Sequence, residues 1–180
     1  MNSISKARRH GAAFSMRLRV AALVSLVSLA SLTLVPNTAL ALVKPAQAAI
    51  KTVANFDANT WAPLLKKGPR PAAYVFTNTF CPSCPEAFAL LNKTIQASGK
   101  PVALVGVVMD VPANKALAYS RHYTGVTQLY AFDGYEPEIR QTIDPSWRNI
   151  TPYSVLVGRD GAVQRVTGLP DAEQLKAWLR

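Results

Sequence analysis

The chain has 180 residues, of which 49% are apolar and 17% charged, a balance that supplies the core of one domain and excludes a disordered chain. Its formal charge of +10 would suggest a nucleic acid or an anionic membrane as a partner if it were spread over a compact domain. Six basic residues and no acidic one lie in positions 1–48, so residues 49–180 carry 14 basic and 10 acidic side chains. The remaining +4 is scattered, which argues against nucleic-acid binding.

An export signal is expected in residues 1–48. Basic residues are followed by the uncharged stretch 20–35 and then by Pro36, which is the order of a secretory signal. Small side chains allow cleavage after Ala41 or after Ala48, and both sites stay open. The alternative is an uncleaved membrane anchor, since the uncharged stretch continues to residue 43 and roughly 20 apolar residues span a bilayer. Both interpretations place a domain of residues 49–180 outside the cytoplasm, in the periplasm, after Sec-type export.

The first half of this domain predicts alternating helices and strands. A short helix is expected over 59–67, with Trp61 in the core, and a strand over 72–77. Phe88, Leu91 and Ile95 recur at helical spacing, and Gly99 is a typical C-terminal cap. The apolar stretch 102–109 is typical of a central strand that is buried on both faces.

The second half continues this alternation and ends in a hairpin and a helix. A helix is expected over 114–123, a strand over 128–132, and a short helix that begins near Pro137. Two strands, 154–157 and 162–166, are joined by a glycine-bounded turn, and a helix with Leu175 and Trp178 in its buried face closes the chain. The order predicts an α/β sandwich with a mixed sheet whose first strands are parallel.

The two cysteines, Cys81 and Cys84, are too few for a disulfide-rich scaffold or a four-thiolate zinc site, so we expect them to act as a pair. They lie where a strand ends and a helix begins. Free N–H groups and the helix dipole favour a thiolate there, which makes Cys81 the expected nucleophile and Cys84 the resolving thiol. If the helix is counted from Ser83, Pro85 lies in the first turn, where backbone N–H groups have no intrahelical partner and a proline is tolerated. Pro82 also lacks an N–H, so it offers the thiolate one donor fewer.

Three stretches together resemble a known family: the residues around the Cys-Pro-Ser-Cys motif (75–84), the buried strand from Val102, and the segment 150–161, which contains Thr-Pro and the hairpin. They are similar to thioredoxin-fold proteins, and most of all to exported thiol–disulfide oxidoreductases of the TlpA/ResA type. The resemblance covers roughly residues 59–180, nearly all of the expected domain.

This resemblance implies a thioredoxin-like three-layer sandwich, a redox-active Cys81–Cys84 pair and a cis-proline loop at Thr151-Pro152 that packs against the pair. It further implies a helix-and-strand insertion over 112–147. The implied activity is exchange of electrons with the cysteines of other extracytoplasmic proteins, with a membrane protein as redox partner. We expect a monomer, no cofactor and no metal, and the direction of electron flow stays open.

The chain departs from its relatives at positions that tune such a site. Thioredoxins have a buried Asp six residues before the first cysteine, where this chain has Val75, and a Trp directly before it, where this chain has Phe80. Cytochrome-maturation members have a Glu at the place of Ala87, and the nearest acid is Glu86. Phe80 and Glu86 are therefore candidates for tuning the pair, and a role in cytochrome maturation does not follow.

Three other interpretations of the pair remain. An inert structural disulfide is disfavoured because so short a loop constrains little chain entropy. A thiol peroxidase of the peroxiredoxin type would need Pro and Thr or Ser where the chain has Tyr74 and Asn78. A non-enzymatic module that holds copper(I) would use the two soft thiolates.

Some further residues near these motifs allow two interpretations each. Thr77, Asn78 and Thr79 are candidates either for hydrogen bonds to a thiolate or for ordinary loop capping. Trp147 is a candidate for a surface that contacts peptides, and His122 is expected to be an ordinary surface residue.

Overall fold

The structure is a computed structural model of the chain, and it describes residues 49–180. The predicted export signal, its two cleavage sites and the alternative anchor lie outside the described residues. The described helices and strands, in chain order, are β1 (Val53–Phe56), α1 (Trp61–Lys67), β2 (Ala72–Thr77), α2 (Cys84–Ser98), β3 (Ala103–Val108), α3 (Ala113–Ala116), the 3-10 helix η1 (Leu117–His122), β4 (Gln128–Phe132), α4 (Glu136–Ile143), β5 (Tyr153–Val157), β6 (Val163–Thr167) and α5 (Ala172–Trp178).

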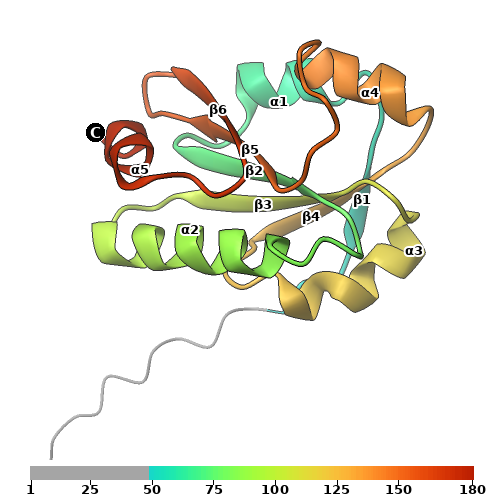
Figure 1. Cartoon of the computed structure of the whole chain (residues 1–180), viewed down its shortest axis with the longest axis horizontal. Coiled ribbons are helices and arrows are strands. Elements are labelled where there is room, and N and C mark those ends of the chain that lie inside the picture. Colours follow the sequence, from blue (N-terminus) through green and yellow to red (C-terminus); the bar gives the residue numbers. More distant parts are fainter. Residues whose placement is uncertain (1–48) are drawn as a thin grey trace, which may run out of the picture. The chain divides into compact units, whose positions relative to one another are not determined.

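A single six-stranded sheet, in the order β1-β4-β3-β2-β5-β6, forms the middle layer (Figure 1). The neighbours among β1 to β4 are parallel, whereas β5 is antiparallel to both β2 and β6. This is the mixed sheet that was predicted. The carboxyl ends of β2, β3 and β4 therefore meet the beginning of β5 and the end of β6 at one edge of the sheet.

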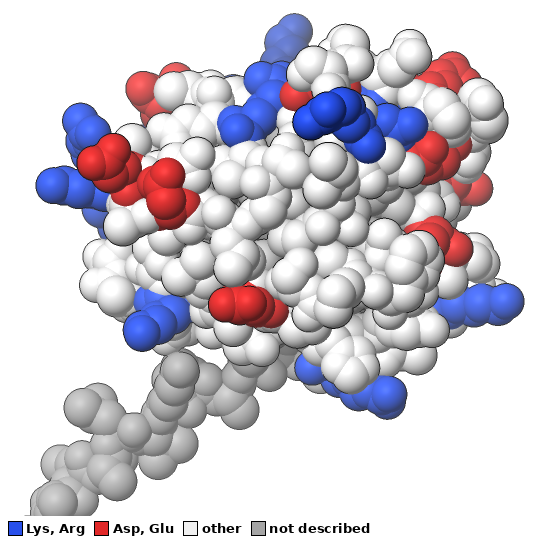
Figure 2. Space-filling model, viewed as in Figure 1, with Lys and Arg blue, Asp and Glu red and all other residues white. Residues whose placement is uncertain are grey.

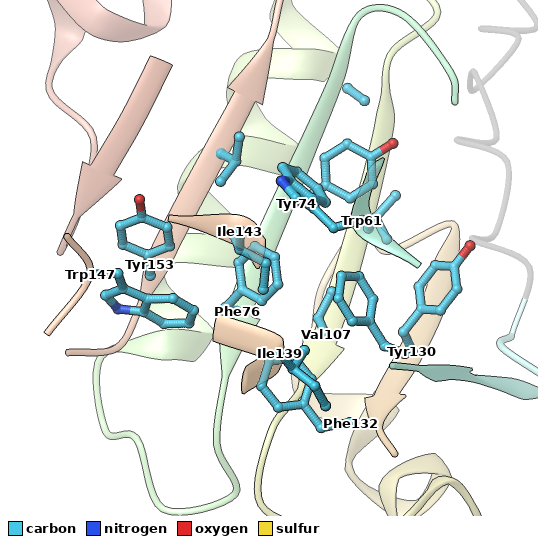
Figure 3. Close-up of a cluster of buried hydrophobic side chains, with 14 of the residues drawn as sticks. Trp61, Tyr74, Phe76, Val107, Tyr130, Phe132, Ile139, Ile143, Trp147 and Tyr153 are labelled. Atoms are coloured by element: carbon cyan, nitrogen blue, oxygen red, sulfur yellow. The ribbon is translucent and has the colours of Figure 1, made fainter. Parts of the chain in front are cut away.

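Helices α1 and α4 cover one face of the sheet, and its core is rich in aromatic rings (Figure 3). Phe76 on β2 lies at the centre, with ring contacts to Phe56, Trp61, Trp147 and Tyr153 among others. Edge-to-face and tilted pairs of this kind add to the gain from burying their area. We call this cluster the aromatic face.

The other face of the sheet is covered by α2, α5 and the α3–η1 segment, and we call it the dithiol face because α2 begins at Cys84. Its core is mostly aliphatic, with Phe88 and Leu91 from α2 packed on the sheet. Gly106 permits this close approach, because a Cβ there would lie 2.8 Å from a methyl carbon of Leu129 and 3.5 Å from the Phe88 ring.

Most of the predicted elements are confirmed, and two points differ. Strand β1 was not predicted: Phe56 is its one buried residue, and two of the other three are exposed, so the sequence lacks the strong apolar pattern of the central strands. The helix predicted over 114–123 is divided into α3 and η1. β4, from the predicted insertion, lies between β1 and β3 and so widens the sheet.

Charged side chains are interspersed on the face of the molecule seen in Figure 2, without a cluster of one sign. This agrees with the scattered charges of residues 49–180. Within the described part of the chain, no helix has the length and apolar composition needed to cross a membrane.

Candidate active site

A disulfide between Cys81 and Cys84 closes the turn that leads from β2 into α2. Ser83 precedes the helix, and Pro85 lies in its first turn, as counted from the sequence. The backbone N–H of Ala87 donates to the Ser83 carbonyl 3.1 Å away, which begins the helical hydrogen bonding. The local sequence therefore places the cysteine pair at the N-terminus of a 15-residue helix.

The two sulfur-bearing residues differ in accessibility. Cys81 is 9% exposed, whereas Cys84, the first residue of α2, is 1% exposed. Pro82 lies at the surface, and the Ser83 hydroxyl is 3.9 Å from the Cys81 sulfur. An incoming thiol or disulfide can therefore reach Cys81 before it reaches Cys84.

The segment before Cys81 is held by Asp110, which follows β3. The Thr79 backbone N–H donates to both carboxylate oxygens of Asp110, each at 3.0 Å, and the Thr79 hydroxyl donates to one of them at 2.5 Å. Hydrogen bonds to an ionised carboxylate are stronger than neutral ones. Loop capping is thus the role of Thr79, and no local motif indicates Asp110, because the two residues are 31 positions apart.

The loop at Thr151-Pro152 lies beside this segment, and its peptide bond is cis. The Asn78 side-chain amide donates to the Thr151 hydroxyl at 3.2 Å. The Gly168 N–H, which follows β6, donates to the Pro152 carbonyl at 2.8 Å. Three chain segments therefore meet at the edge of the sheet where Cys81 lies.

Thioredoxins bury an acidic residue under their dithiol, and this chain has an apolar residue at the same position. Val75 is fully buried on β2, and its partner across the antiparallel pair is Ser154 on β5. The hydroxyl of Ser154 is buried without a hydrogen-bond partner in the described structure. Thr77 is also fully buried, and its hydroxyl donates to the Asn78 carbonyl at 3.2 Å.

A cavity of about 170 Å³ opens beside the disulfide. Its walls come from the strand-to-helix turn and from η1, the segment of the predicted insertion. The lining residues are Asn78, Thr79, Cys81, Cys84, Pro85, Tyr119, His122 and Tyr123. One imidazole and two phenols thus line the same cavity as both cysteines. No local motif in the sequence indicated this arrangement.

The phenol of Tyr123 stays protonated in this cavity at neutral pH. Burial raises the pKa of Tyr123 to about 12, although its hydrogen bond with Thr77 acts in the opposite direction. Tyr123 also packs on Phe88 of α2, with ring centroids 4.6 Å apart. This residue therefore anchors η1 against α2 and is not a base near pH 7.

Two further candidate residues from the sequence, Glu86 and Trp147, have different outcomes. Glu86 is exposed in the first turn of α2, and no hydrogen bond or ion pair of it is found in the described structure, so only its charge acts near the helix N-terminus. The prediction for Trp147 was wrong: it is 5% exposed, stacks on Tyr153 at 4.3 Å and donates its indole N–H to the Ile150 carbonyl. Its place in the aromatic face is set by contacts with distant strands, which its position in the sequence did not reveal.

His122 is exposed, as predicted, but it also lines the cavity beside both cysteines. Phe80 is 77% exposed directly before Cys81, so its ring is available to a partner. No group of three or more His, Cys, Asp or Glu side chains in residues 49–180 is arranged to hold a metal ion.

No protein-family model and no curated protein matches the sequence. Its fold is similar to that of several solved structures. A thioredoxin-related protein from Neisseria meningitidis serogroup B is 19% identical, with a TM-score of 0.49 over 69% of this chain and 96% of that one. A thio-disulfide isomerase from Thermus thermophilus is 21% identical, with a TM-score of 0.47 over 63% and 79% of the two chains.

A secreted disulfide oxidoreductase from Mycobacterium tuberculosis is 23% identical, with a TM-score of 0.42 over 61% of this chain and 79% of that one. At sequence identities this low, the similarity is one of fold alone. The thioredoxin-like architecture of this chain rests on its own sheet topology, with the disulfide between β2 and α2 and the cis-proline before β5.

Proposed function

We propose that this chain is a thiol–disulfide oxidoreductase that exchanges electrons with the cysteines of other proteins outside the cytoplasm. The observation that carries the proposal is the Cys81–Cys84 disulfide at the start of α2, which lines an open cavity and in which Cys81 is the more exposed cysteine. A structural disulfide has no need of this placement, because a ring of four residues restricts the unfolded chain very little.

In the reduced form, Cys81 is the nucleophile. The unpaired N–H groups and the positive end of the α2 dipole favour its thiolate. The thiolate attacks one sulfur of a partner disulfide, forms a mixed disulfide and releases the other partner sulfur as a thiolate. Cys84 then attacks the Cys81 sulfur, which restores the intramolecular disulfide and releases the second partner sulfur. The partner gains two electrons, and the reverse sequence oxidises it.

The surroundings of Cys81 favour a polypeptide as the substrate. All four large apolar side chains exposed in the described structure belong to loops at the same edge of the sheet: Phe80, Tyr135, Ile150 and Leu169. Phe80 precedes Cys81, Ile150 precedes the Thr151-Pro152 loop, and Leu169 follows the glycine that is bonded to Pro152. Exposed apolar residues gathered in this way indicate contact with apolar side chains of a partner.

A Cys84→Ser variant tests the proposal by removing the resolving thiol. We expect it to accumulate mixed disulfides between Cys81 and partner proteins, visible on non-reducing gels and removed by dithiothreitol, whereas a Cys81→Ser variant forms none. The wild-type protein should also catalyse reduction of insulin. Absence of both mixed disulfides and insulin reduction would contradict the proposal.

The reduction potential of the pair decides the direction of exchange. A potential near −270 mV, about that of thioredoxin, would make the chain a reductase, and one near about −120 mV would make it an oxidase. Equilibration with glutathione or dithiothreitol buffers, read by alkylation of the free thiols, measures this value.

A further inference from the structure

One wall of the cavity beside the disulfide contains an imidazole. His122 lines it from η1, and both cysteines line it from the turn and from α2. Histidine is the side chain whose ordinary titration lies closest to neutrality, whereas the Tyr123 phenol holds its proton up to a pKa of about 12. His122 is the only histidine among the described residues.

One ring nitrogen of His122 accepts a hydrogen bond from its neighbour in the chain. The Arg121 Nε–H donates to His122 Nε2 at 3.2 Å. Both side chains are exposed, and a hydrogen bond at the surface exchanges readily with water. Nε2 is therefore a hydrogen-bond acceptor, and water can take the place of Arg121 as its donor.

Water can connect the imidazole to the sulfur atoms. The cavity volume of about 170 Å³ exceeds what one water needs. Asn78, which also lines it, has a buried side-chain oxygen without a hydrogen-bond partner in the described part of the chain. A buried polar atom of this kind is normally hydrated, so the cavity offers water at least one fixed partner between the turn and η1.

We propose that His122 accepts the proton of Cys84 during resolution of the mixed disulfide, a role that rests on the proposed exchange activity. The Cys84 thiol gives its proton through water to His122, and its thiolate attacks the Cys81 sulfur. The Cys81–Cys84 bond forms as the bond from Cys81 to the partner breaks. The released partner thiolate takes the proton back from the imidazolium, so protons and electrons balance.

Two carboxylates, Asp110 and Glu86, belong to the segments around this cavity, but neither lines it. Asp110 accepts three hydrogen bonds from Thr79, and Glu86 is exposed on α2 and does not line the cavity. Val75 removes the carboxylate that thioredoxins place below their dithiol. The other titratable or charged groups around His122 are Cys81, Cys84, Tyr119, Arg121 and Tyr123.

The two thiol steps can be timed separately with dithiobis(nitrobenzoate). The reduced protein releases one thionitrobenzoate when Cys81 attacks and a second when Cys84 resolves the mixed disulfide. In His122→Gln we expect the second release to be about tenfold slower at pH 7, a fraction of the full effect of general base catalysis because thiols also ionise unaided. The first release should keep its wild-type rate. At pH 9 the difference should narrow, since hydroxide then competes with the imidazole for the Cys84 proton.

Ser120→Ala on the same 3-10 helix is the matched control, because Ser120 does not line the cavity, and it should behave as wild type. Equal second-release rates in His122→Gln and wild type at pH 7 would overturn the role of His122 and leave the exchange activity standing. A deficit that is as large at pH 9 as at pH 7 would overturn it as well, since it would show a structural effect. A wild-type protein that releases no second thionitrobenzoate and reduces no insulin would instead contradict the proposed function itself.

Discussion

Helices α1 and α4 pack against one face of the sheet through aromatic rings, whereas α2 and α5 pack against the other through mostly aliphatic side chains. The polar features of the interior differ in the same way. The dithiol face contains the buried hydroxyls of Thr77 and Ser154 and ends in the cavity beside the cysteines. β2 belongs to both faces, since its alternate residues point to opposite sides. The aromatic face therefore fixes the strand that leads to Cys81, and the dithiol face carries the chemistry.

The clearest difference between the two faces is expected for Cys81→Ser, which should affect activity far more than stability. Cys81→Ser should abolish insulin reduction, because the nucleophile is lost. The free energy of unfolding should fall by no more than about 2 kcal/mol, the contribution of a ring of four residues to chain entropy. Turnover assays and denaturant titration of the oxidised wild type and the variant measure the two effects. A much larger loss of stability would show that the disulfide is chiefly structural.

Phe76→Ala should show the opposite behaviour. Phe76 is fully buried and contacts rings from five other segments, so its truncation should lower the free energy of unfolding by about 3–5 kcal/mol. The rate of thionitrobenzoate release by the protein that remains folded should stay within about twofold of wild type, since the aromatic face contributes no group to the cavity. A large change in this rate would break the division between the faces.

Asp110→Asn should act on the chemistry with a smaller effect. The carboxylate accepts three hydrogen bonds from Thr79, and loss of its charge should lower the free energy of unfolding by about 1–2 kcal/mol. Because Thr79 lies two residues before Cys81, a loosened turn should also slow the attack by Cys81. Stopped-flow measurement of the first thionitrobenzoate release reads this step. Asp133→Asn is the matched control: Asp133 follows β4 at the same edge, but it accepts from Asn55 instead. Equal slowing in both variants would contradict a specific role for Asp110.

The smallest effect is expected on stability at acidic pH. Burial opposes ionisation of Asp144, but hydrogen bonds from Ser146 and Tyr153 and the charge of Arg165 outweigh it and hold its pKa below the ordinary 3.8. Because the folded pKa is the lower one, this stabilisation is present above pH 4 and is lost as the pH falls below it. Asp144→Asn should therefore lose less stability than wild type between pH 5 and pH 3. Denaturant titrations at both pH values test this, and an equal loss would assign the acid sensitivity to other groups.

The sequence predicted what depends on near neighbours. The spacing of Phe88, Leu91 and Ile95 located α2, Gly99 located its end, and the apolar stretch of β3 showed that it is a central strand. β1 was missed because only Phe56 of its four residues is buried, which leaves no periodic signal. Trp147 was misplaced because its neighbour in the packed structure, Tyr153, is reached only when β5 joins the sheet.

The sequence alone determined that one pair of cysteines lies at the start of a helix, because strand, turn and helix signals within twenty residues are local. Tertiary structure decided which groups surround that pair. Asp110 reaches Thr79 across 31 positions, Asn78 reaches Thr151 across 73, and His122 enters the cavity only because η1 packs over α2. Such contacts depend on the order of the strands and on how the inserted segment folds back, and no spacing along the chain encodes them individually.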